Sequence, residues 1–314
     1  MPFLCLKVDV DTLRGTLEGV PRLIELFKRE NVGATFLFSM GPDHTGRALK
    51  RIFRPGFLAK VRRTSVRSNY GLKTLLYGTL LPGPDIGVRA ADPMRAARDA
   101  GFECGIHCWD HVSWQDGAMH KSEAWVRGQM DRAHERFTQV FGAPATTCGA
   151  AGWQMSVAAL RHQGQLSYRY ASDARAADNQ SSPFWPLVHA EALPVPQIPS
   201  TLPTLDELIG LDGCTPDNVH QRLLQLTTNN TRDHVFTLHA ELEGMALLPV
   251  MERLLSGWRD QGYRLSSTGG YFDSINVETL PYCEVSWREI AGRSGTLVTQ
   301  GAPYLANLDQ TMRR

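Results

Sequence analysis

Hydrophobic and polar positions follow two different periods along this chain. Short apolar runs of the kind that form buried strands are separated by stretches in which hydrophobic residues recur three or four positions apart. The run Phe3–Val10 predicts a buried strand, and residues 34–39 predict a second one. Between them, residues 18–30 predict an amphipathic helix that stops near Asn31. One face of that helix carries Val20, Leu23, Ile24 and Phe27.

The same alternation continues to about residue 266. Further strands are predicted at residues 102–107, 145–150, 166–172, 195–199, 234–240 and 263–266. Further helices are predicted at residues 92–100, 122–141, 156–163, 215–226 and 245–261. This alternation favours parallel strands joined by crossover helices, so we expect an α/β fold. A closed barrel fits the chain length, and an open doubly wound sheet is the alternative.

Composition and charge are those of a protein that can bury a large core. The chain has 314 residues, of which 42% are hydrophobic and 21% are charged, and its formal net charge is +1. This balance argues against a general polyanion binder. The six cysteines form no Cys-x-x-Cys pair, which predicts reduced thiols in a cytosolic protein. The chain shows neither a secretory signal pattern nor an apolar stretch of about 20 residues, so we expect a cytoplasmic protein that can still lie on a membrane surface.

Carboxylates and imidazoles gather at the ends of three predicted strands. These positions are Asp9-Val10-Asp11, the segment from His107 to His111, and the segment from His239 to Glu241. Sites in parallel α/β folds are built at the carboxyl edge of the sheet. The three segments are therefore expected to meet at that edge.

The spacing within the first two segments points to a metal ion. Asp9 and Asp11 lie two residues apart, which places both carboxylates on one side of an extended strand, where a divalent cation would relieve their repulsion. The alternative is a solvated strand end or a helix cap. His107 and His111 lie four residues apart, so they share a helical face or cluster in a turn that leaves a strand. Neutral imidazoles suit zinc and similar metals, although such a pair also occurs without a function.

His239 ends the apolar run HVFTLH, and Glu241 follows two residues later. A lone histidine is commonly a core residue with satisfied nitrogens, but its place at a strand end favours a functional role. Together these groups supply what amide hydrolysis requires. Asp9 would take a proton from water, and His239 would protonate the departing amine. The metal ligands would be Asp11, His107 and His111.

The ordered set of motifs resembles the polysaccharide deacetylase family, also called the NodB-homology family or carbohydrate esterase family four. That family has paired aspartates after its first strand, an HxxxH motif and a late histidine, which here are Asp9 and Asp11, His107 and His111, and His239. The resemblance spans about residues 3–266 and implies a distorted (β/α)7-like barrel of the NodB type. The chain departs from the family in that Val10 separates the aspartates and residues 147–153 lack the arginine of the third motif.

The chain resembles one subgroup most closely, the ArnD-type deformylases, in these departures and in the segments VDVDTLRGTLEGVPRL, HCWDHVSWQ, AAGW, SDARAA, IPSTLPTLDELIG and TLHAELEG. This resemblance implies removal of formate from 4-deoxy-4-formamido-L-arabinose carried on undecaprenyl phosphate. The implied pathway modifies lipid A and gives polymyxin resistance. An Asp-His-His ligand set suits one divalent zinc ion, with manganese, cobalt, nickel or iron as alternatives.

A basic amphipathic insertion follows the second predicted strand, at residues 44–85. Between His44 and Pro84 the chain has no acidic residue, and basic residues alternate with large apolar ones. This pattern is typical of an element at a membrane surface, and the alternatives are a helical hairpin on the barrel or a nucleic-acid contact. With the resemblance, we expect no nucleic acid but an anionic membrane surface, on the cytoplasmic face of the inner membrane. The expected lipid contacts are Arg51, Arg54, Arg62, Arg63 and Arg67.

Six further residues are candidates for substrate binding or orientation, namely Arg14, Trp109, Trp153, Asp173, Arg175 and Glu241. The tryptophans are expected to stack on a sugar, with core packing as the alternative. Asp173 and Arg175 are expected to form an orienting charge pair. Cys108 is expected to be a buried residue that does not bind the metal, and Asp110 is expected to orient one histidine.

The predicted organisation is one NodB-like domain over residues 1–282 with a C-terminal extension at 283–314. Periodicity is weak in the extension, which predicts a cover or a loose end. Two alternatives to the deformylase stay open. One is a deacetylase of another amino sugar, and the other is a catalytically inactive barrel that acts as a membrane-surface scaffold. Formate or acetate release would separate the two enzymes, and metal analysis would identify the scaffold.

Overall fold

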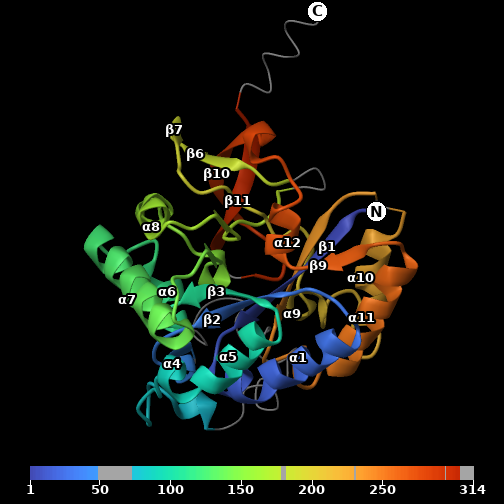
Figure 1. The fold of residues 1–314 in the computed structure, drawn as a ribbon, viewed down its shortest axis with the longest axis horizontal. Coiled ribbons are helices and arrows are strands. Elements are labelled where there is room, and N and C mark those ends of the chain that lie inside the picture. The colour runs from blue at the N-terminus through green and yellow to red at the C-terminus, as the bar shows by residue number, and fades with distance from the viewer. Residues whose placement is uncertain (49–72, 178–181, 230, 294, 305–314) are drawn as a thin grey trace, which may run out of the picture.

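A curled sheet of seven parallel strands forms the centre of the molecule, as a computed structural model shows for residues 1–48, 73–177, 182–229, 231–293 and 295–304 (Figure 1). The strands are β1 Phe3–Val10, β2 Thr35–Ser39, β3 Glu103–Cys108, β4 Thr147–Cys148, β5 Tyr170–Ala171, β8 His234–His239 and β9 Arg264–Ser266. Their order is β5-β4-β3-β2-β1-β8, and β9 pairs with the first residues of β1. This is the expected distorted (β/α) barrel.

Helices lie around the outside of this sheet (Figure 1). They are α1 Val20–Arg29, α4 Ile86–Arg89, α5 Ala91–Asp99, α6 His111–Gly117, α7 Glu123–Phe141, α8 Val157–Gln163, α9 Leu205–Leu208, α10 Val219–Thr227, α11 Leu248–Asp260 and α12 Thr268–Phe272. Shorter turns are η1 Gly15–Gly19, η3 Thr74–Leu76, η4 Ala151–Trp153, η5 Gly164–Leu166 and η6 Val277–Thr279.

The core between α1 and the sheet follows from the predicted apolar face of that helix. Phe27 of α1 contacts Phe36 of β2 and Phe102, with ring centroids 6.2 and 6.1 Å apart. All three aromatic residues are buried, as are Val20 and Leu23. Burial of such side chains stabilises the fold by about 1.5–3 kcal/mol each.

Capping residues explain where the longest helix begins and ends. The Ser122 side chain accepts a hydrogen bond from the Trp125 backbone N–H at the start of α7. Gly142 ends the helix in the left-handed conformation, with φ of 76°. The predicted bounds of 122–141 are therefore confirmed to within one residue. The other predicted helices and strands are also present, with ends that differ by no more than four residues, apart from one strand.

The predicted strand at residues 195–199 is wrong. This segment forms only isolated bridges, from Gln197 to Ala171 and to Phe184. Its sequence contains Pro196 and Pro199, which lack the N–H groups that a continuous ladder requires.

A second sheet of four strands was not predicted. It has the order β11-β10-β6-β7 and consists of β6 Trp185–Val188, β7 Glu191–Ala192, β10 Tyr282–Glu289 and β11 Thr296–Pro303. The C-terminal extension thus contributes an antiparallel hairpin whose first strand pairs in parallel with β6. Trp287 of this hairpin donates a hydrogen bond to the carbonyl of Met155, 2.9 Å away, which attaches the small sheet to the barrel.

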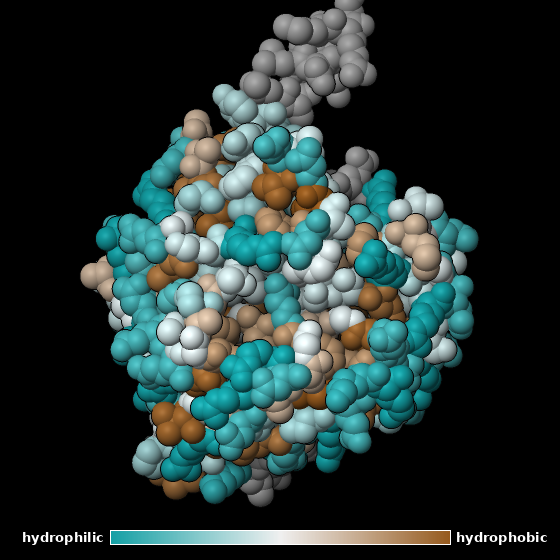
Figure 2. Space-filling model, in the orientation of Figure 1, coloured by the Kyte–Doolittle hydropathy of each residue, from teal (hydrophilic) through white to brown (hydrophobic). Residues whose placement is uncertain are grey.

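Most of the face shown in Figure 2 is hydrophilic, with hydrophobic residues in separate small groups. Among the described residues, none of the helices combines the length and the hydrophobicity that crossing a bilayer requires. The predicted lipid contacts at positions 51, 54, 62, 63 and 67 lie outside the described residues.

Candidate active site

Strand order brings the three chemical segments to one edge of the main sheet. β1 lies between β8 and β2, and β3 is the next strand beyond β2. Asp9 on β1 pairs in register with His239 on β8. His107 lies near the end of β3, and His111 is the first residue of α6. The two histidines therefore cluster in a turn that leaves a strand, which is one of the two predicted arrangements.

Asp11, His107 and His111 form a compact group that could hold a metal ion. One ligand atom from each residue lies within 4.8 Å of the other two. Asp11 Oδ1 lies 3.2 Å from His107 Nε2, and Asp11 Oδ2 lies 3.3 Å from His111 Nε2. Asp11 Oδ1 is buried and makes no hydrogen bond within the described part of the chain. One carboxylate and two imidazoles fit a divalent metal and leave room in its coordination shell for water.

The local electrostatics keep Asp11 charged. Burial disfavours its carboxylate, but His111 and His107 outweigh this effect and hold the pKa of Asp11 below its usual range. His107 Nδ1 faces the carbonyl oxygen of Gly149 at 2.7 Å. Since that oxygen only accepts hydrogen bonds, Nδ1 carries a proton, and Nε2 is the nitrogen that faces Asp11. A metal ion would bind His107 through Nε2, while Gly149 holds Nδ1.

Asp9 lies beside His107 and beside Lys7, a residue that the sequence analysis did not select. Asp9 Oδ1 is 3.8 Å from both Lys7 Nζ and His107 Nδ1. It is buried and has no hydrogen-bond partner among the residues that the structure describes. The fully buried ammonium of Lys7 donates a hydrogen bond to the carbonyl of Ser172 at 2.8 Å. A charged residue within the apolar run FLCLKVDV, two positions before Asp9, was the available signal.

His239 lies on β8, the strand that pairs with β1, and contacts the buried Glu243, which the sequence analysis also missed. The backbone N–H of His239 donates to Glu243 Oε2 at 2.8 Å. Burial raises the pKa of Glu243 to about 7, although His239 opposes the change. His239 Nδ1 is buried and has no hydrogen-bond partner in the described ranges. In the sequence, the only signal for Glu243 was its position four residues after His239.

Glu241 holds the turn that carries Asp11. Its Oε1 accepts hydrogen bonds from the backbone N–H groups of Asp11 and Thr12 at 3.0 and 2.8 Å, and from the Thr12 hydroxyl at 2.8 Å. A side chain at Gly15 would collide with this carboxylate, because its Cβ would lie 1.9 Å from Oε1. Of the two roles expected for Glu241, these contacts match orientation, since they hold the segment that bears the candidate ligand Asp11.

Trp153 is packed in the interior, where it has no surface for a sugar. It is only 1% exposed, and the guanidinium groups of Arg175 and Arg293 lie 4.7 and 4.8 Å from its ring centroid. The alternative of core packing is therefore the one that fits. Arg293 comes from the C-terminal extension, and the sequence analysis missed it.

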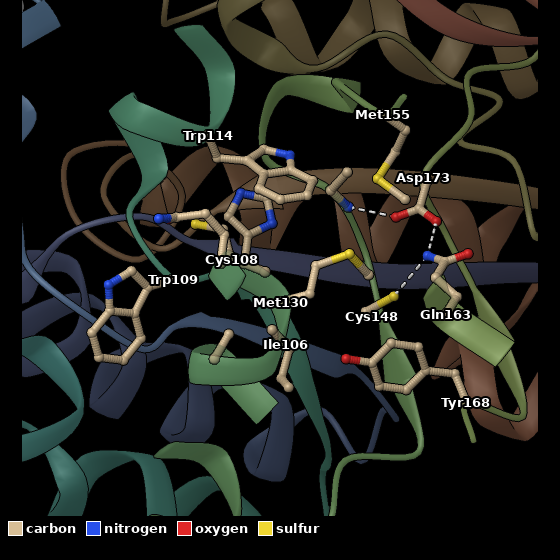
Figure 3. Close-up of a pocket in the computed structure, with 14 residues that line it drawn as sticks. Ile106, Cys108, Trp109, Trp114, Met130, Cys148, Met155, Gln163, Tyr168 and Asp173 are labelled. Carbon is tan, nitrogen blue, oxygen red and sulfur yellow. Dashed lines mark hydrogen bonds between the residues drawn. The ribbon is translucent and has the colours of Figure 1, made fainter. Parts of the chain in front are cut away.

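The expected charge pair between Asp173 and Arg175 is wrong. Arg175 forms a two-pronged ion pair with Glu207 instead, at 2.9 and 3.1 Å. Asp173 accepts hydrogen bonds from the backbone N–H of Ala150 at 2.7 Å and the side-chain amide of Gln163 at 2.6 Å (Figure 3). Asp173 and Arg175, two positions apart in the SDAR segment, thus belong to different polar networks. Asp173 lines a cavity of about 30 Å³ that His107 also lines, together with Met130, Cys148, Met155 and Tyr168 (Figure 3).

Trp109 and Arg14 are partly exposed near the site, and their expected contacts with substrate stay predictions. The ring of Trp109 lies 5.4 Å from the guanidinium groups of both Arg132 and Arg136. Arg14 pairs with Glu18, with 3.1 Å between Nε and Oε1.

Cys108 and Asp110 lie between the candidate metal ligands His107 and His111 in sequence. Cys108 is buried with its Sγ 3.3 Å from the Ser39 hydroxyl, and it is not part of the candidate ligand group. Asp110 was expected to orient a metal-binding histidine. Its ring partner is instead His44, whose Nδ1 lies 2.6 Å from Asp110 Oδ2. The sequence analysis did not select His44, because nothing near it in the chain forms a pattern with it.

Comparison with known proteins places the chain in a family, although no family model matches it. A relative from Shewanella sediminis (strain HAW-EB3), named "Probable 4-deoxy-4-formamido-L-arabinose-phosphoundecaprenol deformylase ArnD", is 36% identical over 297 residues, which cover 95% of this chain and 94% of the relative. A relative of the same name from Wigglesworthia glossinidia brevipalpis is 29% identical, with 91% and 98% covered.

Solved structures share the fold at lower sequence identity. A "putative polysaccharide deacetylase" from Mycobacterium smegmatis is 15% identical with a TM-score of 0.58, covering 91% of this chain and 95% of that one. The chitin deacetylase of Colletotrichum lindemuthianum is 13% identical with a TM-score of 0.51, and 85% and 86% are covered. These likenesses support the fold alone. From the sequence relatives and this fold together, the chain belongs to the ArnD deformylase family, built on the polysaccharide deacetylase barrel.

Proposed function

We propose that this protein is a metal-dependent amide hydrolase that removes formate from 4-deoxy-4-formamido-L-arabinose linked to undecaprenyl phosphate. The product would be the free amino sugar on the same carrier, for lipid A modification and polymyxin resistance. The observation that carries this proposal is the group Asp11, His107 and His111 beside the buried, paired positions Asp9 and His239. The names of the relatives supply the substrate.

The ligand set favours zinc, with manganese, cobalt, nickel or iron as alternatives. A metal ion bound by Asp11, His107 and His111 would lower the pKa of water and polarise the formyl carbonyl. Asp9 is a buried carboxylate whose Oδ1 accepts no hydrogen bond from the described residues, and it would take a proton from the attacking water. The water oxygen joins the formyl carbon, and the C–N bond breaks. His239 would give a proton to the departing nitrogen, which otherwise leaves poorly.

Metal analysis and product analysis test this function together. We expect the purified protein to hold about one divalent ion and to release formate from the formamido sugar. Asp11→Ala and His107→Ala each remove one of three protein ligands, so both variants should lose the metal and at least about 99% of turnover. The control is His120→Ala, since His120 is exposed and outside the ligand group.

Three outcomes would separate the competing functions. Release of acetate but no formate from matched sugars would favour a deacetylase. A protein that holds no metal, and that stays inactive after zinc, cobalt or manganese is added, would favour the scaffold. Formate release by the metal-free Asp11→Ala variant would contradict the proposed role of the ion.

We further propose that the protein works on the cytoplasmic face of the inner membrane, without crossing it. A substrate with a lipid carrier requires access to a bilayer surface. The stretch between His44 and Pro84 supplies basic residues without an acidic one. Each basic residue near an anionic surface adds about 1 kcal/mol of attraction.

Neutralising Arg62, Arg63 and Arg67 together to glutamine should weaken binding to anionic vesicles by roughly 10- to 100-fold. Co-sedimentation with vesicles of defined anionic lipid content at moderate salt measures the effect. Hydrolysis of a short-chain analogue should stay unchanged. A control triple variant of the exposed residues Arg22, Lys28 and Arg253 removes the same charge from helices α1 and α11. If both triple variants bind equally well or equally poorly, the basic stretch has no specific role.

A further inference from the structure

The segment that follows β2 lies between the two segments that carry the metal ligands. The backbone N–H of Met40 donates to the carbonyl of Cys108 at 2.9 Å, and that of Gly41 donates to the carbonyl of Trp109 at 2.8 Å. These bonds continue the β2–β3 ladder past the ends of both strands. These backbone hydrogen bonds alone hold the start of residues 40–45 beside the turn between His107 and His111.

Asp43 connects this segment to the loop after Asp11. Asp43 Oδ2 accepts a hydrogen bond from the backbone N–H of Leu13 at 2.9 Å. Asp43 Oδ1 accepts from the backbone N–H of Thr45 at 3.1 Å and from its hydroxyl at 2.7 Å. The side chain is buried, with 2% of the residue exposed. Both oxygens thus act as acceptors for backbone N–H groups on different sides of the carboxylate.

His44 connects the same segment to the helix that begins with His111. His44 Nδ1 lies 2.6 Å from Asp110 Oδ2. Asp110 Oδ1 accepts the backbone N–H of Ser113 at 3.0 Å, which makes Asp110 the N-cap of α6. The imidazole is enclosed by backbone, because a Cβ at Gly78 or Gly83 would lie 2.7 or 2.5 Å from its Cδ2 atom. Contacts with Gly78 and Gly83 and the bond to Asp110 therefore restrict the orientation of the imidazole ring.

We propose that Asp43 and His44 are positioning residues of the metal site. Asp43 holds the loop that follows Asp11, and His44 holds the N-cap of the helix that presents His111. Metal affinity depends on ligand distances to within about 0.2 Å, and the ligands come from two segments that are separate in sequence, the end of β1 and the turn from β3 to α6. A support that spans both segments keeps Asp11 Oδ2 and His111 Nε2 at their spacing of 3.3 Å. This inference rests on the proposed function, since it assigns residues to the same metal site.

The hydrogen-bond geometry distinguishes between substitutions at position 44. His44→Leu keeps apolar bulk against Gly78 and Gly83 but has no donor for Asp110. His44→Asn is smaller but places an amide N–H near the position of Nδ1. If the hydrogen bond to Asp110 matters for the metal site, Asn should preserve the function of His44 and Leu should not. A purely space-filling role for His44 predicts the opposite order.

Metal affinity is the measurement, made on the full chain by titrating the metal-free protein with Co²⁺ or Zn²⁺ against a competing chelator. We expect His44→Leu to weaken binding by about 10- to 100-fold and His44→Asn to remain within about threefold of the wild type. Asp43→Asn should also weaken binding by about tenfold, because an amide cannot accept from both backbone N–H groups. His120→Leu, at an exposed histidine, is the matched control and should bind like the wild type.

Thermal unfolding of the metal-free variants separates positioning from a general loss of structure. The inference expects the loss of affinity to follow the missing hydrogen bond, in variants whose metal-free Tm stays close to that of the wild type. Equal affinity in His44→Leu and wild type would overturn it, as would equal losses in the Leu and Asn variants. A wild-type protein that binds neither metal would instead overturn the proposed function itself.

Discussion

Replacing His239 by alanine should lower kcat by a factor of about 10²–10⁴ and leave the metal content at the wild-type level. His239 pairs in register with Asp9 and is buried on β8, but it is not in the group of ligand atoms formed by Asp11, His107 and His111. The variant therefore removes the proposed proton donor for the departing amine and none of the proposed ligands. A group that acts only in the transition state affects kcat more than KM.

Steady-state kinetics with the formamido sugar and metal analysis of the same preparation measure both quantities. His234→Ala is a suitable control, since His234 lies at the other end of β8 and its Nδ1 is 3.1 Å from the Thr201 hydroxyl. Loss of metal in His239→Ala would show that the assignment of acid and ligands is wrong. Turnover within threefold of the wild type would show that another group protonates the nitrogen.

Replacing Lys7 by methionine should lower the free energy of unfolding by about 3–5 kcal/mol, although methionine is more hydrophobic. Lys7 is fully buried, with Nζ 3.8 Å from Asp9 Oδ1 and 2.8 Å from the carbonyl oxygen of Ser172. Burial lowers the pKa of Lys7, while Asp9 and Asp173 oppose the change because both favour its charged form. Removing the ammonium leaves these buried carboxylates without a nearby compensating charge, which costs more than the methionine side chain returns.

Urea denaturation at neutral pH measures the effect, with the slope m checked to be unchanged. Lys28→Met on the exposed side of α1 is the matched control and should change stability by less than about 0.5 kcal/mol. If Lys7→Met is as stable as the wild type, the carboxylates do not need Lys7 for charge compensation. If Lys7→Met is less stable for the reason given, adding Asp173→Asn to it should recover part of the lost stability, since one of the two buried negative charges is removed.

Local patterns in the sequence predicted most of the main barrel, because burial imposes a period on each strand and helix. β1 was predicted at its observed bounds, since the run Phe3–Val10 is apolar enough to be buried on both faces. The small sheet escaped prediction because β7 has only two residues and β10 buries little beyond Cys283 and Val285. Strands held chiefly by pairing with distant partners leave a weak periodic signal of their own.

Part of the candidate site was also accessible from local spacing. Asp9 lies on β1 and Asp11 directly follows it, and His107 and His111 flank one turn, so both pairs were found from positions close in sequence. Lys7, His44, Glu243 and Arg293 were missed. Lys7 bonds to Ser172, His44 to Asp110 and Arg293 to Glu207, and each of these partners lies far away along the chain. Glu243 bonds to the backbone of His239, four residues away. Hydrogen bonds and ion pairs between distant residues leave no period in a sequence.

The sequence by itself determined the alternation of strands and helices and which residue types stand at the strand ends. These features follow from local backbone geometry and from which side chains can be buried. The ligand group Asp11, His107 and His111 was predicted from the sequence, but only the tertiary structure shows Asp11 within reach of both histidines. Only the tertiary structure decided that Arg175 pairs with Glu207 rather than with Asp173. The physical reason is that carboxylates two residues apart on one face are equivalent along the chain. They become different only when the end of β3 and the turn after it bring His107 and His111 to Asp11, while Asp9 lies beside the Lys7 ammonium of its own strand.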